Sequence, residues 1–419
     1  MNGRRTIAAL AILVTTALQI VQPTARLGAD PGCGWSPVGN TLFPDLNARY
    51  WKIVVPLRSG QQIRISGQFP HARYMAYALQ GPGGSGDAVH DTAITPDAGS
   101  SNPFLAGADR NTTARSYSLR IAPGTAPASG RPVNTLYSGE GAIAEHLVTI
   151  IYRIYDVDAA ADQATGGGLP TVATVDAAGT VARTCTDNHG GVTPGASFAP
   201  VPAGGDRTIG AVGTNPPSWQ KFVNTATVYT QILHSDLLGD AIYDRVSTAT
   251  SSGAAGGLGA NVDNQYVSTL LNPNYGRVLA LTAAMPTHPD TYQGQSPMGA
   301  GQVRYWSMCT EILATTQAVR CLPDHAVPVR ADGTFTIVVS APQDRPRNAS
   351  EACGVAWLPM GTVPGTVLLM RNMLADPGFA QGIGNAELNH EADTMGAYYP
   401  RGQYFRDAAA YEATGCTSR

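Results

Sequence analysis

The chain has 419 residues and a formal net charge of −3, and only 14% of its residues are charged, against roughly 25% in ordinary soluble domains. This charge balance excludes a broad basic surface of the kind that attracts nucleic acid. Hydrophobic residues make up 43% of the chain, and Gly (47) and Pro (30) are abundant. The length suffices for two or three domains, and the Gly and Pro content favours strands joined by turns over long helices.

The N-terminus predicts an export signal. A basic head, "MNGRR", precedes a mostly apolar stretch from Thr6 to Val21, and Ala29 offers a small residue for cleavage. The apolar stretch is shorter than the ~20 residues of a membrane-spanning helix. We therefore expect residues 1–29 to be a removable signal peptide, with an uncleaved membrane anchor as the alternative. The mature chain is expected to be secreted or held in the cell envelope, with no transmembrane span and no lipid anchor at Cys33.

The cysteines indicate disulfides, because an even number in an exported chain is typical of a disulfide framework. Cys309 and Cys321 flank a short stretch that can fold back as two strands, so we expect these two to pair. The partners of the others stay open; they are Cys33, Cys185, Cys353 and Cys416. No Cys-x-x-Cys or His-x-His spacing occurs and no phosphate-binding Gly-rich loop opens a helix, so we expect neither a metal site nor a cofactor.

The chain repeats itself. The stretches "GQQIRISGQFP" (60–70) and "GRVLALTAAMP" (276–286) carry apolar residues at matching places, at a constant offset of 216 residues. Further on, "RYMAYAL" at Arg73 corresponds to "RYWSMC" at Arg304, after an extra loop of 15 residues (287–301) in the second copy. The alternation of apolar and polar residues predicts half-buried strands, and so long a period indicates duplicated domains and excludes a solenoid.

We expect a mainly β fold with two tandem antiparallel β-sandwich (jelly-roll-like) domains and a short helical insertion between them. Residues 30–195 form the predicted first domain and residues 260–419 the predicted second domain, which ends in a helical tail. Residues 196–259 are predicted to hold a linker and a helix that begins after Ser218, a candidate N-cap. The Gly-rich stretch 251–260 predicts a surface loop, with a mobile lid as the alternative.

Several motifs resemble an exported bacterial family of unknown function. They are "DTAITPDAGSSNPF", "ARYMAYAL", "RYWSMC", "GVAWLP" and "LLMRNMLADPGF". The layout is similar to that of the paired domains of unknown function 1254 and 1214, over most of the chain after the signal. The resemblance implies an exported protein of two β-sandwiches, and it supplies no catalytic residues.

The candidate catalytic residues are His90, Asp91 and Asp97, which cluster with Asp87 in "GDAVHDTAITPD". Together they offer acid–base groups or oxygen ligands for Ca²⁺. The alternative is turn chemistry, in which Asp accepts hydrogen bonds from nearby backbone N–H groups. Asp324 occupies the matching place in the second copy and favours the alternative, because a turn that defines the fold should recur. No Gly-x-Ser-x-Gly nucleophile elbow occurs.

Arginines at strand ends recur in both copies, as Arg73 and Arg304 and as Arg153 and Arg371. A buried guanidinium needs a carboxylate, and we expect that carboxylate in the same copy. The predicted partners are Asp91 and Asp158 in the first copy and Asp324 and Asp376 in the second. The functional alternative places arginines and aromatic rings in a cleft between the sandwiches, where they bind a carboxylate or a sugar. Its ligand-binding candidates are Arg73, Tyr74, Arg153, Tyr155, Arg304, Tyr305 and Arg371.

The function that we expect is binding of a small molecule, a glycan or a cell-envelope component in the groove between the two domains. Domain junctions commonly host ligand sites, and the sequence contains no recognisable catalytic motif. A secreted hydrolase or lyase that acts on a polysaccharide or related polymer is the alternative. A purely structural component of the envelope is a third hypothesis. Whether the chain is an enzyme stays open.

Overall fold

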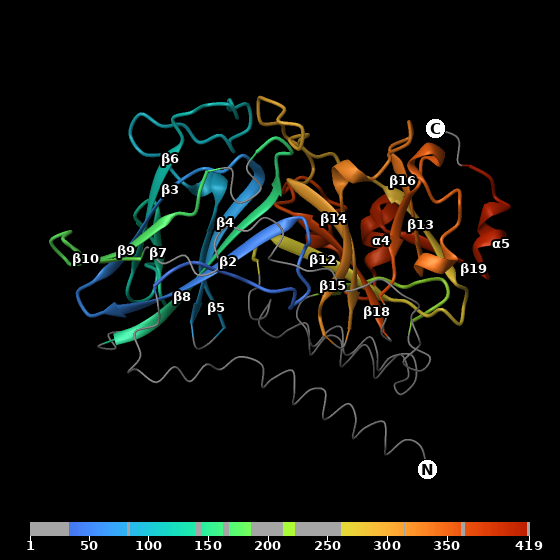
Figure 1. The fold of residues 1–419 in the computed structure, drawn as a ribbon, viewed down its shortest axis with the longest axis horizontal. Helices are drawn as coiled ribbons and strands as arrows, with labels where there is room; N and C mark the ends of the chain where they lie inside the picture. The colour runs from blue at the N-terminus through green and yellow to red at the C-terminus, as the bar shows by residue number, and fades with distance from the viewer. Residues whose placement is uncertain are drawn as a thin grey trace, which may run out of the picture.

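The computed structural model describes residues 33–81, 84–139, 145–161, 167–185, 213–222, 261–313, 315–361 and 365–416. These residues form four sheets and only short helices, so the predicted mainly β fold class is confirmed. The N-terminal half, blue to green in Figure 1, lies beside the C-terminal half, yellow to red. The predicted signal peptide lies outside the described residues. Within them, no helix has the length and apolar character needed to cross a membrane.

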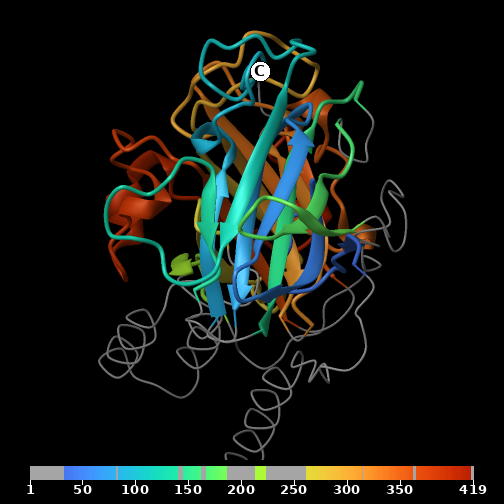
Figure 2. The ribbon, with the colours of Figure 1, turned by 90° about the vertical axis from the view of Figure 1, so that its left-hand side faces the viewer.

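The first half packs two five-stranded sheets face to face. Figure 2 shows this half in front, with its strands running roughly vertically. One sheet has the order β1 (Ser36–Pro37), β2 (Ala48–Arg58), β8 (Glu145–Val157), β4 (Ala72–Gly81) and β5 (Gly84–His90). The other has the order β10 (Val181–Cys185), β9 (Thr171–Val175), β3 (Gln62–Gln68), β6 (Ser116–Ala122) and β7 (Thr135–Tyr137). A single 3₁₀ turn, η1 (Asp91–Ala93), follows β5.

The second half contains a five-stranded and a four-stranded sheet. The first has the order β11 (Gln220–Phe222), β12 (Asn264–Leu270), β18 (Thr366–Met373), β14 (Tyr305–Ile312) and β15 (Ala318–Pro323). The second has the order β17 (Ala356–Pro359), β16 (Thr334–Ser340), β13 (Val278–Ala284) and β19 (Arg401–Phe405). Its short helices are η2 (Asp324–Ala326), η3 (Pro342–Asp344), η4 (Glu351–Cys353), η5 (Ile383–Asn385), α4 (Glu391–Met395), η6 (Gly396–Tyr398) and α5 (Ala408–Glu412).

The helix predicted to begin after Ser218 does not begin there. Residues 220–222 are strand β11, which pairs with residues 266–268 of β12. The spacing of Trp219 and Phe222 fits a helix turn, but pairing to the edge of a sheet satisfies the same backbone groups. The rest of the predicted helix and the predicted loop 251–260 lie outside the described residues.

The two halves repeat the same strand order and the same pairing register. The order β1-β2-β8-β4-β5 of the first half recurs as β11-β12-β18-β14-β15 in the second. Ile63 of β3 faces Ile121 of β6, and Leu279 of β13 faces Val339 of β16 at the corresponding places. The offset read from the sequence therefore corresponds to equivalent positions in two similarly built halves.

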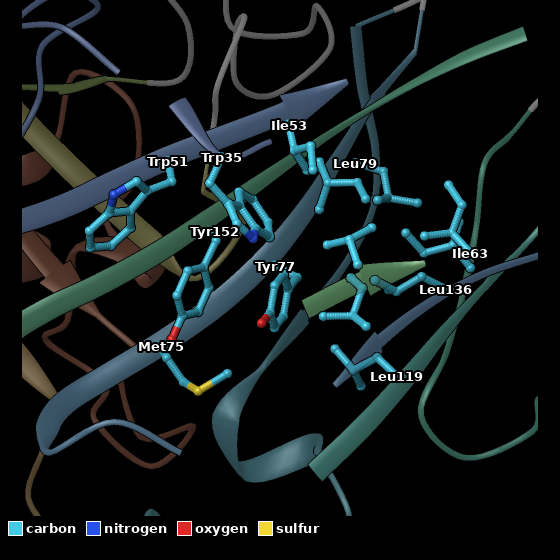
Figure 3. Packing of buried hydrophobic residues seen from close by; sticks show 14 of the residues in the cluster. Trp35, Trp51, Ile53, Ile63, Met75, Tyr77, Leu79, Leu119, Leu136 and Tyr152 are labelled. Carbon is cyan, nitrogen blue, oxygen red and sulfur yellow. The ribbon is translucent and has the colours of Figure 1, made fainter. Parts of the chain in front are cut away.

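The core of the first half lies between its two sheets. Ile53 and Leu79 extend from one sheet toward Ile63 and Leu119 of the other, and all four are at most 2% exposed (Figure 3). Alternate residues of each strand point inward, which is why the sequence alternates. Full burial of each such side chain is worth about 1.5–3 kcal/mol, so these layers hold each half together.

Three disulfides join all six cysteines. The expected bridge between Cys309 and Cys321 is present, and the two residues lie directly opposite each other on β14 and β15. The pairs that the sequence left open are Cys33–Cys185 and Cys353–Cys416. These bridges fit an extracytoplasmic protein, because disulfides persist in oxidising compartments.

Candidate functional site at the junction of the two halves

Two of the recurrent arginines, Arg73 and Arg304, lie at the junction and pair across it. Arg73 Nη1 on β4 is 3.0 Å from Asp324 Oδ2 of the second half. Arg304 Nη1, next to β14, is 3.5 Å from Asp91 Oδ1 of the first half. The expectation that Asp91 and Asp324 pair with an arginine of their own copy is therefore wrong. The halves pack so that each arginine meets the 3₁₀ turn of the opposite half.

Both carboxylates are also anchored in their own half. Met75 N donates to Asp91 Oδ2 at 2.8 Å, and Trp306 N donates to Asp324 Oδ2 at 3.0 Å. Burial raises the pKa of Asp91 to about 6, although the Arg304 guanidinium favours its charged form. Because Asp91 and Asp324 make the same two kinds of contact, we interpret both as structural residues that stabilise the junction.

The seven predicted ligand-binding residues meet at this junction. All but the half-buried Arg304 are at most 2% exposed. The Tyr74 hydroxyl donates to Asp263 Oδ2 at 2.7 Å, and the Tyr305 hydroxyl donates to Asp45 Oδ2 at 2.9 Å. Arg371 pairs with the same carboxylate of Asp45. These groups face protein atoms, and their role in ligand binding stays a prediction.

The candidate catalytic residues of the first half separate into different contacts. His90 Nδ1 lies 3.0 Å from Asp263 Oδ1 of the second half, and this hydrogen bond raises the pKa of His90. Asp87 and Asp91 are each paired with an arginine. Asp97 lies in the turn after η1, where its backbone N–H donates to a strand carbonyl. The structure therefore brings His90 to Asp263, and the catalytic role of these residues stays a prediction.

A second histidine–aspartate pair crosses the junction, and sequence reasoning missed it. His325 Nδ1 in η2 lies 3.3 Å from Asp156 Oδ1 at the end of β8. The imidazole stacks on Tyr292, with ring centroids 3.8 Å apart and planes at 9°. Asp156 has φ +51°, a left-handed conformation that is uncommon outside glycine. Tyr292 thus covers one face of the ring, and the Asp156 carboxylate lies near Nδ1 without a hydrogen bond to it.

Arg73 compensates the carboxylates beneath His325. Its Nη2 lies 2.9 Å from Asp156 Oδ2, and its Nη1 contacts Asp324. Ligand atoms of Asp156, Asp324 and His325 lie within 4.8 Å of one another, a spacing that suits a metal ion. The guanidinium of Arg73 already supplies a positive charge to both carboxylates, so the group is better explained as an ion-pair cluster.

The histidine and the aspartate of this pair occur in one copy only, although both copies have the same backbone conformation at the place of the aspartate. Thr92 stands where the second half has His325, and Leu374 stands where the first half has Asp156. Leu374 keeps the left-handed backbone, with φ +43°. Its N–H donates to Asp263 O, as the N–H of Asp156 donates to the O of Asn47. Comparison of the two copies for changed chemistry at an equivalent place would have identified the pair from the sequence.

The loop that carries Tyr292 is the 15-residue insertion of the second copy, between β13 and β14. It lies at the top of the junction in Figures 1 and 2, beside loops of the first half. Arg110 Nη1 donates to Gln295 O at 2.8 Å, and Ala159 N donates to Tyr292 O at 2.7 Å. The first half therefore holds the insertion that supports His325.

A pocket of about 500 Å³ opens beside His325, a size typical of small-molecule sites. Its wall consists of residues in and after η2, among them Val327, Val329 and Arg330. Glu351 and Gly354, which come later in the sequence, complete the lining. Asp156 lies at the Nδ1 side of the ring, so Nε2 is the nitrogen available to the pocket. A second pocket, of about 690 Å³, is lined by residues such as Gln302 and Phe379 and includes no histidine. All residues that line the first pocket belong to the second half, and we name it the junction pocket only because His325 in its wall also lies at the junction.

The chain matches no family model, and no curated protein sequence matches it. Two solved structures are similar. An uncharacterised protein from Burkholderia cenocepacia is 10% identical, with a TM-score of 0.45, over 87% of this chain and 84% of that one. The VPA0106 protein of Vibrio parahaemolyticus is 9% identical, with a TM-score of 0.39, over 88% of this chain and 92% of that one. The resemblance to the paired domains of unknown function 1254 and 1214 is not confirmed.

Proposed function

We propose that this chain is an exported protein that binds a small ligand in the junction pocket. The observation that carries the proposal is His325, an imidazole in the pocket wall whose side chain is 20% exposed. Tyr292 of the insertion stacks on its ring, and Asp156 of the other half lies 3.3 Å from its Nδ1. A ring so placed at a concave surface is preorganised, which lowers the entropic cost of binding.

Export is the second part of the proposal. It is supported by the N-terminal sequence and by the three disulfides. The motifs quoted above further suggest a relation to the exported proteins with paired domains of unknown function 1254 and 1214. Expression of the full chain with its leader tests export: we expect a mature protein that begins after Ala29. A full-length chain retained in the cytoplasm would contradict it.

A ligand screen tests the binding. The mature chain would be surveyed by thermal unfolding against small metabolites and short glycans, and ligands that raise Tm would be titrated by calorimetry. We expect ligands that stabilise the wild type and Thr92→Ala, the matched variant at the equivalent place of the first half, but not His325→Ala. The proposal fails if no compound binds or if His325→Ala binds the same ligands equally well.

A hydrolase or lyase is the alternative function, and one observation favours it. His325 lies in the pocket wall with a buried carboxylate 3.3 Å from its Nδ1, and histidine is the side chain that most often serves as a general base. Product analysis after prolonged incubation of each bound ligand separates the two functions. A ligand recovered unchanged supports binding, and cleavage that is lost in His325→Gln supports the enzyme.

A further inference from the structure

We propose that the junction pocket selects ligands that carry a carboxylate, held jointly by His325 and Arg330. The inference rests on the proposed ligand-binding function. Both residues line the pocket and both carry N–H donors. Hydrogen bonds from a cationic donor such as Arg330 to a carboxylate are roughly twice as strong as neutral ones, so this residue would dominate recognition, with His325 as the second donor.

The charge of Arg330 is open to a ligand. Its Nη1 donates to Thr334 Oγ1 at 3.1 Å, and its Nη2 donates to Thr336 Oγ1. Both partners are neutral hydroxyls. Among the ion pairs of the described residues, none includes Arg330. The hydroxyls orient the guanidinium, and Asp332, which accepts a hydrogen bond from Thr334 Oγ1, supplies a negative charge near it without a direct ion pair.

The carboxylates near His325 do not keep a negatively charged ligand out of the pocket, because Arg73 compensates their charge. The side chains of Asp156 and Asp324 are 2% and 0% exposed, and both contact Arg73 on the side away from the solvent. Their negative charge is therefore compensated beneath the pocket. The imidazole of His325 lies between this buried cluster and the pocket, where an N–H at Nε2 can donate to an anion.

Glu351 gives the pocket a negative group and the experiment a control of opposite sign. This residue lines the same pocket, and its negative charge opposes that of a ligand carboxylate, so we expect Glu351→Gln to strengthen binding. It also favours a ligand whose far end carries hydroxyl groups. Glucuronate, with a carboxylate and several hydroxyls, matches both features, and its neutral methyl ester has nearly the same shape.

The test titrates the mature chain with glucuronate, lactate and acetate at low salt, and with methyl glucuronate and glucose as neutral counterparts. We expect at least one carboxylate to bind while its neutral counterpart does not. Arg330→Gln and His325→Gln should each weaken binding by roughly tenfold or more, and Arg330→Lys by less, because it keeps the charge. Circular dichroism of each variant checks that it is folded.

Three results would overturn the inference. They are equal binding of an acid and its neutral counterpart, unchanged affinity in folded Arg330→Gln, and no binding of any of the three carboxylates. These results can be told apart from a failure of the proposed function itself. If the screen yields a neutral ligand that requires His325, the pocket binds ligands and only the preference for carboxylates is wrong.

Discussion

Asp324→Asn should lower the free energy of unfolding by about 3 kcal/mol. The Asp324 carboxylate oxygens lie 3.0 and 3.1 Å from Arg73 Nη1, and both side chains are fully buried. At 3 Å and an effective dielectric constant of about 20, the attraction is about 5 kcal/mol. Asp156 stays 2.9 Å from Arg73 Nη2 in the variant and keeps part of this energy. Removal of one partner from a buried pair typically costs about 3–5 kcal/mol, and the remaining contact places this change at the lower end.

Urea unfolding at pH 8, followed by tryptophan fluorescence, measures the change, and Asp91→Asn is its matched control. Asp91 occupies the equivalent place, but burial raises its pKa to about 6, so the folded protein already disfavours its charged form. We expect Asp91→Asn to cost about 1 kcal/mol or less. The reasoning is refuted if Asp324→Asn unfolds at the wild-type urea concentration, or if the control variant loses as much stability.

Three further changes test the junction and the sheets. Burial raises the pKa of Asp91 to about 6, and a hydrogen bond raises that of His90, so the folded state binds these protons more tightly than the unfolded chain does. Stability should therefore rise as the pH falls from 7.5 to 5.5, by about 1 kcal/mol from Asp91 alone, and urea titrations of Asp91→Asn should lack this part. Replacement of Cys309 and Cys321 by Ala should cost about 3 kcal/mol because the bridge closes a short loop, and an unchanged Tm would contradict this. Tyr74→Phe removes a buried hydrogen bond to a carboxylate of the other half and should cost about 1–3 kcal/mol in urea unfolding; no loss would mean that the bond is not made.

The strands and the repeat could be predicted because they depend on local pattern. Ile63 and Ile65 alternate with polar residues, and the same alternation returns in the second copy at a constant offset. The extended backbone of residues 220–222 could not be predicted in this way. The apolar spacing around Trp219 fits a helix, and only the neighbouring edge of β12 decides for a strand.

The partners at the junction could not be predicted because the sequence does not specify which half supplies them. Each half contains an arginine followed by an equivalent aspartate: Arg73 by Asp91, and Arg304 by Asp324. Either aspartate would neutralise Arg73. The packing of the halves decides the choice. The pair of His325 and Asp156 was within reach of the sequence, since both differ from their counterparts in the other copy, but their contact depends on the same packing.

The coupling free energy between arginine and aspartate, obtained from double-mutant cycles at pH 8, tests the reciprocal junction most directly. The contacts predict coupling of about 1 kcal/mol or more for Arg73 with Asp324 and for Arg304 with Asp91. They predict less than about 0.5 kcal/mol for Arg73 with Asp91 and for Arg304 with Asp324. Strong coupling within each half and weak coupling between the halves would contradict the account.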